Sequence, residues 1–316
     1  MKKTGLLFDE RYLRHRTGPY HPESPERLIV ILNGLKVAGL LPSLHVFTGR
    51  AADTRELEWI HDPRYIERFR AACERGDTTF DSADNQMCPE TYEAALVAVG
   101  GVLDAVGKVM RGEIDNAFCP IRPPGHHAER AKAMGFCYFN NVAIAARCLQ
   151  NVWGLERIGI VDFDVHHGNG TQHLFQKDPT VFYYSIHEHP SFAFPGTGRE
   201  FDYGNDEGYG FTRNSTVLPG EGDAVYRTRI EEELVSDFEA FRPQFILLST
   251  GFDAHEDDDM SDVRLSTEGF SWLGKQVVQL ADRFAEGRLV SVLEGGYCLQ
   301  RLPELAANHV RILLNH

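Results

Sequence analysis

Short apolar runs and longer amphipathic segments alternate along this chain. Four of the short runs are about as long as a strand and are rich in Ile, Val, Leu and Phe; they cover residues 117–121, 158–161, 245–248 and 289–293. Continuous apolar runs of this length predict strands buried on both faces, as in parallel sheets. The short apolar stretch that ends at Phe8 predicts one further strand.

The longer segments carry apolar residues at helical spacing. They predict helices at 92–110, 141–150, 226–241 and 270–284. Strands that alternate with helices indicate βαβ units around a parallel sheet. No internal repeat and no Ser/Pro/Gly-rich linker divides the chain, so we expect an α/β fold in which residues 1–316 form a single domain.

A polar cluster follows each of the four apolar runs. The clusters are Pro-Pro-Gly-His-His at 123–127, Asp-Phe-Asp-Val-His-His at 162–167, Gly-Phe-Asp at 251–253 and Glu-Gly-Gly-Tyr at 294–297. Ligands of open parallel sheets bind beyond the carboxyl ends of the strands. We therefore expect the four clusters to meet at one edge of the sheet. Long loops expected at 187–210 and 255–266 follow strand ends at the same edge.

Charge and composition narrow the range of partners. The formal net charge of −14 argues against a nucleic-acid partner and favours a cationic ligand, such as a lysine-rich peptide or a polyamine. No apolar run approaches the roughly 18 residues of a membrane span, so no membrane partner is expected. The six cysteines form no C-x-x-C pair, which favours reduced thiols in a cytoplasmic protein. The acidic run at 256–259 is expected to be a solvated loop.

The cluster at 162–167 has the spacing of a metal site. In a strand, alternate side chains share a face, so Asp162, Asp164 and His166 are expected to point the same way. With Asp253 from another strand end, two carboxylates and one imidazole complete a set of three ligands. Three protein ligands leave a zinc ion one open position for water and substrate, which is typical of a catalytic site.

Two further groups suit hydrolysis of an amide beside such a metal. The imidazoles of His126 and His127 supply candidate bases and acids, with Asp162 and Asn169 as their partners. A carboxylate raises the basicity of its imidazole and an amide only orients it, so we expect the two histidines to differ in acidity. The phenol of Tyr297, which follows two glycines, is a suitable donor to an oxyanion.

These motifs resemble those of the zinc-dependent histone deacetylase superfamily, specifically its class II-like branch of bacterial deacetylases and amidohydrolases. The resemblance runs from His-Pro-Glu-Ser-Pro-Glu-Arg-Leu at 21–28 to the Gly-Gly-Tyr element, in the family's order. It implies the arginase/deacetylase fold, a mainly parallel sheet flanked by helices with long loops at the carboxyl edge. It also implies one zinc per active site, held by Asp164, His166 and Asp253.

The same resemblance assigns roles to the polar residues around the metal. It implies a His126–Asp162 pair, a His127–Asn169 pair and a Tyr297 hydroxyl that polarises the substrate carbonyl. Asn169 stands where class I members have aspartate, and Tyr297 is present where some class II members have histidine. We therefore expect an active enzyme, in which His127 carries both proton transfers and His126 is its electrostatic partner.

Other positions of the chain resemble the substrate tunnel of the family. Gly135, Phe136 and Phe194 resemble the aromatic walls around an acyl-lysine stem. Arg27 resembles a residue that lines an internal acetate pocket, and Asp84 a rim aspartate that holds the substrate backbone. Cys298 departs from the family, because many members have Asn or Asp after the tyrosine. A structural potassium site beside the zinc is implied at Asp162, Asp164, His166, Ser185 and Ile186.

Several functions stay open on these residues. The expected reaction is deacetylation of N6-acetyl-lysine in proteins or peptides, releasing acetate and free lysine. The absence of a long insertion between Phe80 and Tyr92 favours that substrate, whereas the acidic run at 256–259 favours an acetylpolyamine amidohydrolase. A binuclear arginase-like hydrolase would need more metal ligands where this chain has His126, His127 and Tyr297. A non-catalytic module that binds acyl-lysine is the alternative outside the enzymes.

Overall fold

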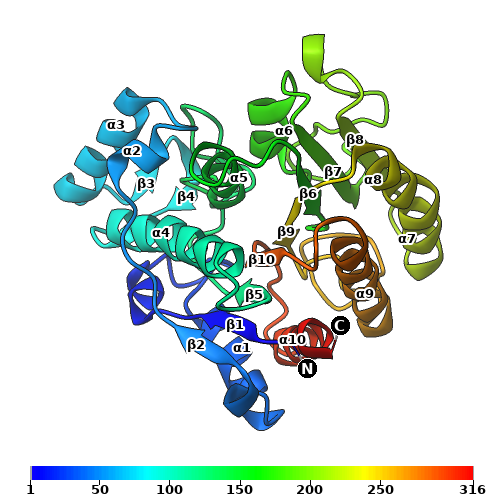
Figure 1. The fold of residues 1–316 in the computed structure, drawn as a ribbon. Helices are drawn as coiled ribbons and strands as arrows, with labels where there is room; N and C mark the ends of the chain where they lie inside the picture. Colours follow the sequence, from blue (N-terminus) through cyan, green and yellow to red (C-terminus); the bar gives the residue numbers. More distant parts are fainter. Residues whose placement is uncertain (1, 316) are drawn as a thin grey trace.

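One parallel sheet organises the molecule. The computed structural model describes residues 2–315, and its eight strands lie in the order β2-β1-β5-β10-β9-β6-β7-β8, with every neighbouring pair parallel (Figure 1). The strands are β1 (Thr4–Leu7), β2 (His45–Phe47), β5 (Asn116–Cys119), β6 (Ile158–Asp162), β7 (Val181–Glu188), β8 (Thr212–Val217), β9 (Phe245–Thr250) and β10 (Leu289–Leu293). A separate antiparallel pair comprises β3 (Thr79–Phe80) and β4 (Ser82–Gln86). The predicted α/β fold is confirmed.

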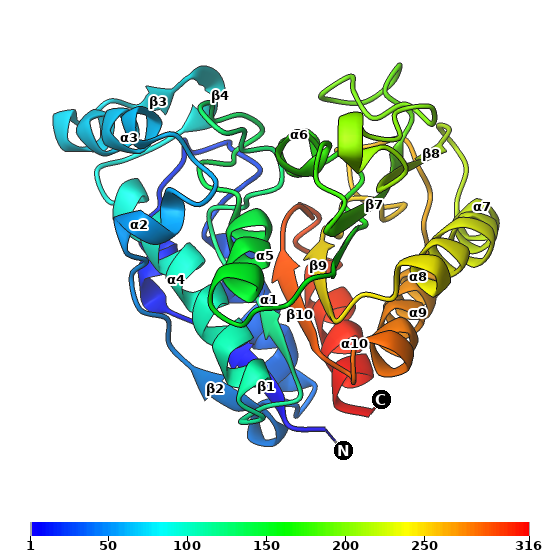
Figure 2. The ribbon, with the colours of Figure 1, turned by 45° about the horizontal axis from the view of Figure 1, so that its top comes forward.

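Helices cover both faces of this sheet. The α-helices are α1 (Glu26–Val37), α2 (Thr54–Leu57), α3 (Pro63–Arg75), α4 (Thr91–Met110), α5 (Asn141–Asn151), α6 (Asn169–Phe175), α7 (Asp223–Arg229), α8 (Val235–Phe241), α9 (Thr267–Phe284) and α10 (Leu302–Asn315). Short 3-10 turns cover Glu10–Arg14, Leu41–Ser43 and Asp206–Gly208. Helices α4 and α5 contact the central strands from one side, and α9 and α10 contact them from the other (Figure 2). Between residues 2 and 315, no helix is both long enough and apolar enough to cross a membrane.

Most elements predicted from the apolar pattern are present. The five predicted strands correspond to β1, β5, β6, β9 and β10, and the helices at 92–110, 141–150 and 270–284 to α4, α5 and α9. The segment 226–241 is helical, but the π-helical turn Ile230–Leu234 separates α7 from α8. The predicted loop at 187–210 is wrong at its start, because β7 continues to Glu188 with all of its residues buried. The loop at 255–266 ends where Ser266 caps α9 by accepting the N–H of Gly269 at 3.0 Å.

The strand order explains why distant clusters meet. Strands β5, β10, β9 and β6 are consecutive neighbours at the centre of the sheet, and every residue in them is buried. They are also the four strands that the polar clusters follow. Because the strands are parallel, their carboxyl ends lie at the same edge, and the four clusters are brought together there.

A buried ion cluster ties the N-terminal segment to this edge. Glu23 is fully buried and pairs with two buried arginines, Arg122 after β5 and Arg27 in α1. The Arg122 Nη2–Glu23 Oε2 distance is 2.8 Å, and the Arg27 Nη1–Glu23 Oε1 distance is 3.2 Å. Although burial opposes ionisation, the charge of Arg122 and a hydrogen bond from His15 hold the pKa of Glu23 well below its ordinary value. The carboxylate is therefore ionised in the core.

We predict that Glu23→Ala lowers the free energy of unfolding by about 3–5 kcal/mol, because it leaves buried guanidinium groups without their counter-charge. Urea denaturation of the parent and the variant measures this loss. Glu26→Ala is the matched control, since Glu26 is exposed and begins α1, the helix that carries Arg27. Equal midpoints for the two variants would contradict the prediction.

Candidate active site

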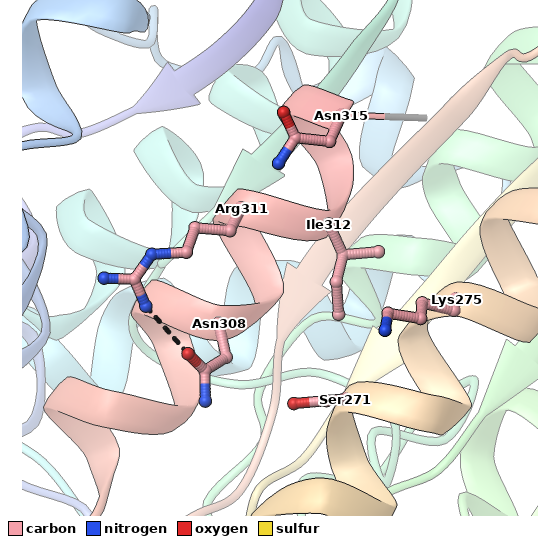
Figure 3. Close-up of a pocket in the computed structure, with 6 residues that line it drawn as sticks. All are labelled: Ser271, Lys275, Asn308, Arg311, Ile312 and Asn315. Carbon is pink, nitrogen blue, oxygen red and sulfur yellow. Dashed lines mark hydrogen bonds between the residues drawn. The ribbon is translucent and has the colours of Figure 1, made fainter.

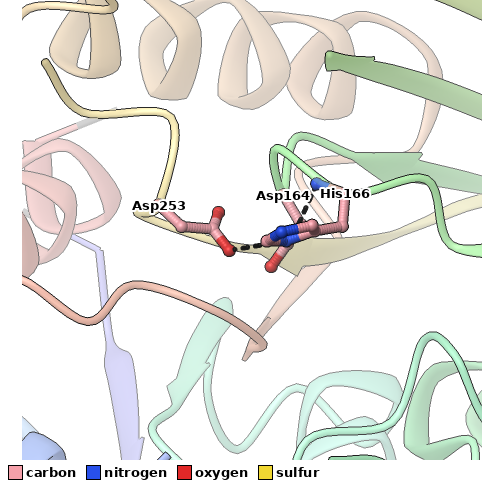
Figure 4. A group of neighbouring side chains, drawn as sticks. All are labelled: Asp164, His166 and Asp253. Carbon is pink, nitrogen blue, oxygen red and sulfur yellow. Dashed lines mark hydrogen bonds and ion pairs between the residues drawn. The ribbon is translucent and has the colours of Figure 1, made fainter. Parts of the chain in front are cut away.

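Three buried side chains from two neighbouring strand ends form a compact set of candidate metal ligands (Figure 4). Asp164, His166 and Asp253 each offer a ligand atom, and these atoms lie within 4.8 Å of one another. The Nδ1 atom of His166 is 3.1 Å from Asp164 Oδ1 and 3.2 Å from Asp253 Oδ2. Burial and the nearby charge of Asp164 raise the pKa of Asp253 to about 7. Two carboxylates this close are difficult to ionise together unless a cation lies between them.

Backbone N–H groups fix both carboxylates from the outer side. Gly295 N donates to Asp164 Oδ2 at 2.7 Å, and Val165 N donates to Asp253 Oδ1 at 3.0 Å. The oxygens that remain face the imidazole of His166. A Cβ atom on Gly295 would collide with both carboxylates, so the chain can pass this close to the ligands only with glycine at that position. Two oxygens and one nitrogen in this arrangement suit zinc with an open coordination position.

The first of the tandem histidines lies against a carboxylate. His126 Nδ1 is 3.1 Å from Asp162 Oδ2, which also accepts the hydroxyl of Tyr183 at 3.0 Å. Burial alone would lower the pKa of His126, but the charges of Asp162 and Asp164 outweigh it and raise the pKa to about 10. His126 therefore carries a positive charge at neutral pH.

The second histidine has the opposite character. His127 Nδ1 is 2.8 Å from Asn169 Oδ1, which can only accept a hydrogen bond, so Nδ1 carries the proton and Nε2 has a free lone pair. Burial and the positive charge of His126 lower the pKa of His127 well below its ordinary value. The two imidazole rings lie 4.0 Å apart between centroids but differ in charge, as expected from their different partners.

A narrow cavity of about 240 Å³ leads to these groups. It is lined by Asp84, His127, Gly135, Phe136, His166, Phe194, Met260 and Tyr297. The ring centroids of Phe194 and His127 lie 5.0 Å apart, and those of Phe136 and Tyr297 lie 6.0 Å apart, both pairs in an edge-to-face arrangement. Gly135 has φ +57°, and a Cβ atom there would collide with the ring of His127. The cavity thus joins an exposed carboxylate at its mouth to the metal ligands at its base.

A second cavity, of about 270 Å³, lies on the outer side of the helices (Figure 3). Its walls come from α9 and α10 and consist of Ser271, Lys275, Asn308, Arg311, Ile312 and Asn315. Arg311 Nη1 donates to Asn308 Oδ1 at 2.8 Å across its rim. The described residues that line it include no carboxylate, imidazole or thiol, so it offers none of the chemistry of the first cavity.

Comparison with known proteins gives the family of the chain. A sequence profile described as "Histone deacetylase domain" matches residues 21–313. The chain belongs to the histone deacetylase family. A "Probable deacetylase" of Archaeoglobus fulgidus is 37% identical over 302 residues, covering 94% of this chain and 82% of the relative. A "Histone deacetylase-like amidohydrolase" of Pseudomonas aeruginosa is 35% identical, covering 96% of this chain and 83% of that protein.

A solved structure of the same family confirms the fold. The crystal structure of the HDA15 HD domain matches with a TM-score of 0.93 and 32% identity, over 100% of this chain and 89% of that one. The family is zinc-dependent in general, and the buried Asp-His-Asp set fits that ion. This member of the histone deacetylase family is therefore a hydrolase of the deacetylase and amidohydrolase class.

Several of the residues named from the sequence do not line the cavity, among them Arg27, Ser185 and Ile186. Arg27 is buried behind Tyr297, with its guanidinium carbon 4.8 Å from the centre of the phenol ring, and it donates to the carbonyls of Glu294 and Gly296. Ser185 lies opposite Asp162 in the register of β6 and β7. Its hydroxyl is 2.7 Å from His187 Nδ1, and its neighbour Ile186 is buried.

Two buried carboxylates near the site were not given a role from the sequence. Glu294 Oε2 accepts the N–H groups of Gly125 and His126 at 2.7 and 3.1 Å, and so holds the histidine cluster in place. Burial raises the pKa of Glu294 to about 7. The expectation that the whole run 256–259 is solvated is wrong for Asp258, which is only 4% exposed. The apolar pattern carries no signal for either role.

Asp258 positions the tyrosine loop. Its Oδ2 atom accepts the N–H groups of Tyr297 and Cys298 at 2.6 and 2.8 Å, and its Oδ1 atom accepts that of Met260 at 3.1 Å. Met260, which the sequence does not single out either, lines the same cavity as Phe136 and Phe194. One carboxylate therefore holds both the phenol and one wall of the cavity.

We predict that Asp258→Ala lowers kcat about 10- to 100-fold, because the backbone N–H groups of Tyr297 and Cys298 lose their acceptor and the phenol shifts. Steady-state kinetics on an acetyl-lysine peptide measures the change. Asp259→Asn is the control, since Asp259 is exposed in the same acidic run. Equal kcat values for the two variants would show that Asp258 does not position the tyrosine.

Proposed function

We propose that this protein hydrolyses the side-chain amide of N6-acetyl-lysine in peptides or proteins, releasing acetate and free lysine. The observation that carries the proposal is the cavity, in which the aromatic rings of Phe136 and Phe194 line the way to the buried metal ligands. Such walls suit an extended alkyl stem, because the stem is uncharged and apolar and the aromatic rings remove it from water. Asp84 is exposed at the mouth, where it would accept N–H groups of a substrate backbone.

The charges around the cavity favour acyl-lysine over an acetylated polyamine. Among the described residues that line it, Asp84 has the only carboxylate. The acidic run adds none to this lining. Asp258 is buried against the tyrosine loop, Asp257 pairs with Arg301 at 2.6 Å, and the other two acidic residues of the run are exposed but do not line the cavity. A polyamine carries several positive charges and would need more acidic groups at the mouth. Acetylpolyamine hydrolysis is thus the second candidate.

We propose one zinc ion per active site, held by Asp164, His166 and Asp253. When bound, it would polarise the amide carbonyl and acidify an attacking water. Support comes from the buried set of two carboxylates and one imidazole. The second oxygen of each carboxylate already accepts a backbone N–H group. This donor set lacks the additional ligands that a binuclear arginase-like site would need, and metal analysis of the purified protein separates one ion from two.

The side chains around the carbonyl have distinct parts in the proposed reaction. His127 Nε2 accepts a proton from the attacking water, while Nδ1 stays bonded to Asn169. The Tyr297 hydroxyl donates to the developing oxyanion, and burial keeps it protonated because it raises the pKa well above the ordinary value. His127 then returns its proton to the leaving amine. His126, held by Asp162, stays charged beside it.

Four further assignments accompany this function. We propose a structural potassium ion near the ends of β6 and β7, where Asp162 and Ser185 are register partners and Asp164, His166 and Ile186 follow closely. Arg27 is proposed to line an internal acetate pocket beneath Tyr297. A single catalytic domain over 1–316 is supported by the one continuous sheet, and a cytoplasmic location by six free thiols.

We predict that the acidic limb of kcat/KM lies below pH 6.5. His127 must be neutral to act as a base, and its pKa is lowered, so it stays neutral until the pH falls below the ordinary histidine value. His127→Ala should lose about 10²–10⁴-fold in kcat. His126→Ala should retain measurable turnover, with the acidic limb moved to higher pH because a positive charge beside His127 is gone. If His126→Ala lost more activity than His127→Ala, the base would be His126 instead.

We predict higher kcat/KM on acetyl-lysine peptides than on longer acyl-lysine peptides or acetylpolyamines. A chelator should abolish all turnover, and added zinc should restore it. Rates measured side by side on the three substrate classes check this. Tyr297→Phe should still bind the peptide but hydrolyse it far more slowly. A parent protein that binds acetyl-lysine and hydrolyses none of these amides would instead be a binding module.

A further inference from the structure

A chain of four polar side chains connects the proposed base to the surface. His127 Nδ1 is 2.8 Å from Asn169 Oδ1, and Asn169 Nδ2 donates to Glu129 Oε1 at 2.6 Å. The same carboxylate oxygen is 2.7 Å from His173 Nδ1. His127 and Asn169 are buried, the Glu129 side chain is 22% exposed, and the His173 side chain is 40% exposed. Glu129 is therefore the first charged group beyond the amide.

The carboxylate is the strongest acceptor that faces the amide and favours one direction of it. Asn169 Nδ2 lies 2.6 Å from Glu129 Oε1, compared with 3.4 Å from the His127 carbonyl and 3.3 Å from the Met134 sulfur. A side-chain amide has one accepting end and one donating end, whereas a carboxylate only accepts. Next to Glu129, the Asn169 amide must present Nδ2 to the carboxylate and Oδ1 to the imidazole. His127 must then carry its proton on Nδ1, which leaves Nε2 free on the side of the cavity. If the amide turned over, Nδ2 would face His127 and favour the opposite tautomer.

The backbone of Glu129 is held rigidly enough for this task. Its N–H donates to the carbonyl of Lys132 at 2.9 Å, and its carbonyl is 3.0 Å from Nδ1 of the buried His61. His61 Nε2 accepts the N–H of Asn140 at 3.0 Å, and burial lowers the pKa of His61 to about 4. The neutral ring can therefore only donate from Nδ1 to the Glu129 carbonyl.

We infer that Glu129 is a positioning residue that sets the tautomer of His127 by fixing the direction of the Asn169 amide. It also supplies a negative charge on the far side of the Asn169 amide. His127 itself has no aspartate as its direct partner. The amide transmits direction and electrostatic influence but no proton. This inference rests on the proposed function of His127 as the base, although the tautomer itself can be observed independently of turnover.

Nuclear magnetic resonance of the zinc-loaded protein with ¹⁵N-labelled histidine tests the tautomer. Long-range ¹H–¹⁵N correlations distinguish a ring protonated on Nδ1 from one protonated on Nε2, and the His127 signals are those lost in His127→Ala. We expect Nδ1–H in the parent and in Glu129→Gln, whose amide oxygen can still accept from Asn169. In Glu129→Ala we expect a population protonated on Nε2.

Kinetics on an acetyl-lysine peptide supplies the second measurement. Glu129→Ala should lower kcat about 10- to 100-fold, the usual effect of removing a partner that orients an active-site group. KM should stay within about twofold, because Glu129 does not line the cavity. Glu129→Gln should lose less than Glu129→Ala. Lys132→Ala is the control, since this exposed residue lies in the same loop and contributes only its backbone.

Exchange of the two side-chain types at Glu129 and Asn169 separates the proposed role from general damage to the loop, because damage would not be repaired by a second substitution. Asn169→Asp places a carboxylate against Glu129, so one of the two must take up a proton and kcat should fall. In the double variant Glu129→Gln/Asn169→Asp, the amide and the carboxylate change places. The glutamine amide at position 129 then donates to the aspartate, which accepts from His127 Nδ1. We expect kcat at least about tenfold above that of Asn169→Asp alone.

These outcomes are separable. An unchanged tautomer and kcat in Glu129→Ala, or a double variant no better than Asn169→Asp, would overturn the role of Glu129. A parent that hydrolyses no substrate would overturn the proposed function, while the tautomer measurement would still decide the inference. Thermal melting of each variant identifies loss of folding. If Glu129→Ala does not fold, Glu129→Gln and the exchanged pair decide between these outcomes.

Discussion

Hydrogen bonds from backbone N–H groups to buried carboxylates hold the catalytic edge of the sheet together. Each carboxylate lies at the end of one strand and binds the cluster that follows another. Glu294 beyond β10 binds the backbone of Gly125 and His126 beyond β5, and Asp164 beyond β6 binds that of Gly295 beyond β10. Such charge-assisted bonds are stronger than neutral ones, and burial strengthens them further. The positions of the metal ligands, the histidines and the tyrosine all depend on them.

This arrangement concentrates carboxyl groups in the interior, where burial opposes their ionisation. Asp162, Asp164, Asp253 and Glu294 are all fully or almost fully buried within the same edge of the sheet. A charged His126 offsets part of their field, and a divalent cation among the ligands would offset most of the rest. His127 does not take up a positive charge in the same way, because its hydrogen-bond partner is an amide rather than a carboxylate. The contrast between the two imidazoles thus follows from what each one touches.

The sequence pattern predicts those parts of the molecule in which the type of residue alone indicates its place in the fold. Continuous apolar runs identify the central strands, and the polar residues after them include the three that form the candidate metal site. The pattern does not identify β7, where Tyr183, Tyr184 and His187 interrupt the apolar character although every residue is buried. Nor does it distinguish Asp258 from its acidic neighbours, or Glu129 from other surface glutamates. Those roles depend on where loops fold in space, and local spacing carries no information about that.

Strand β10 lies between β5 and β9, although it is formed near the end of the chain. During synthesis, two half-sheets, β2-β1-β5 and β9-β6-β7-β8, would emerge first, each with an unpaired apolar edge. Only when residues 289–293 have left the ribosome can the gap between them close. Exposed strand edges of this kind promote aggregation. A nascent chain of this protein would therefore depend on protection of those edges until its last strand inserts.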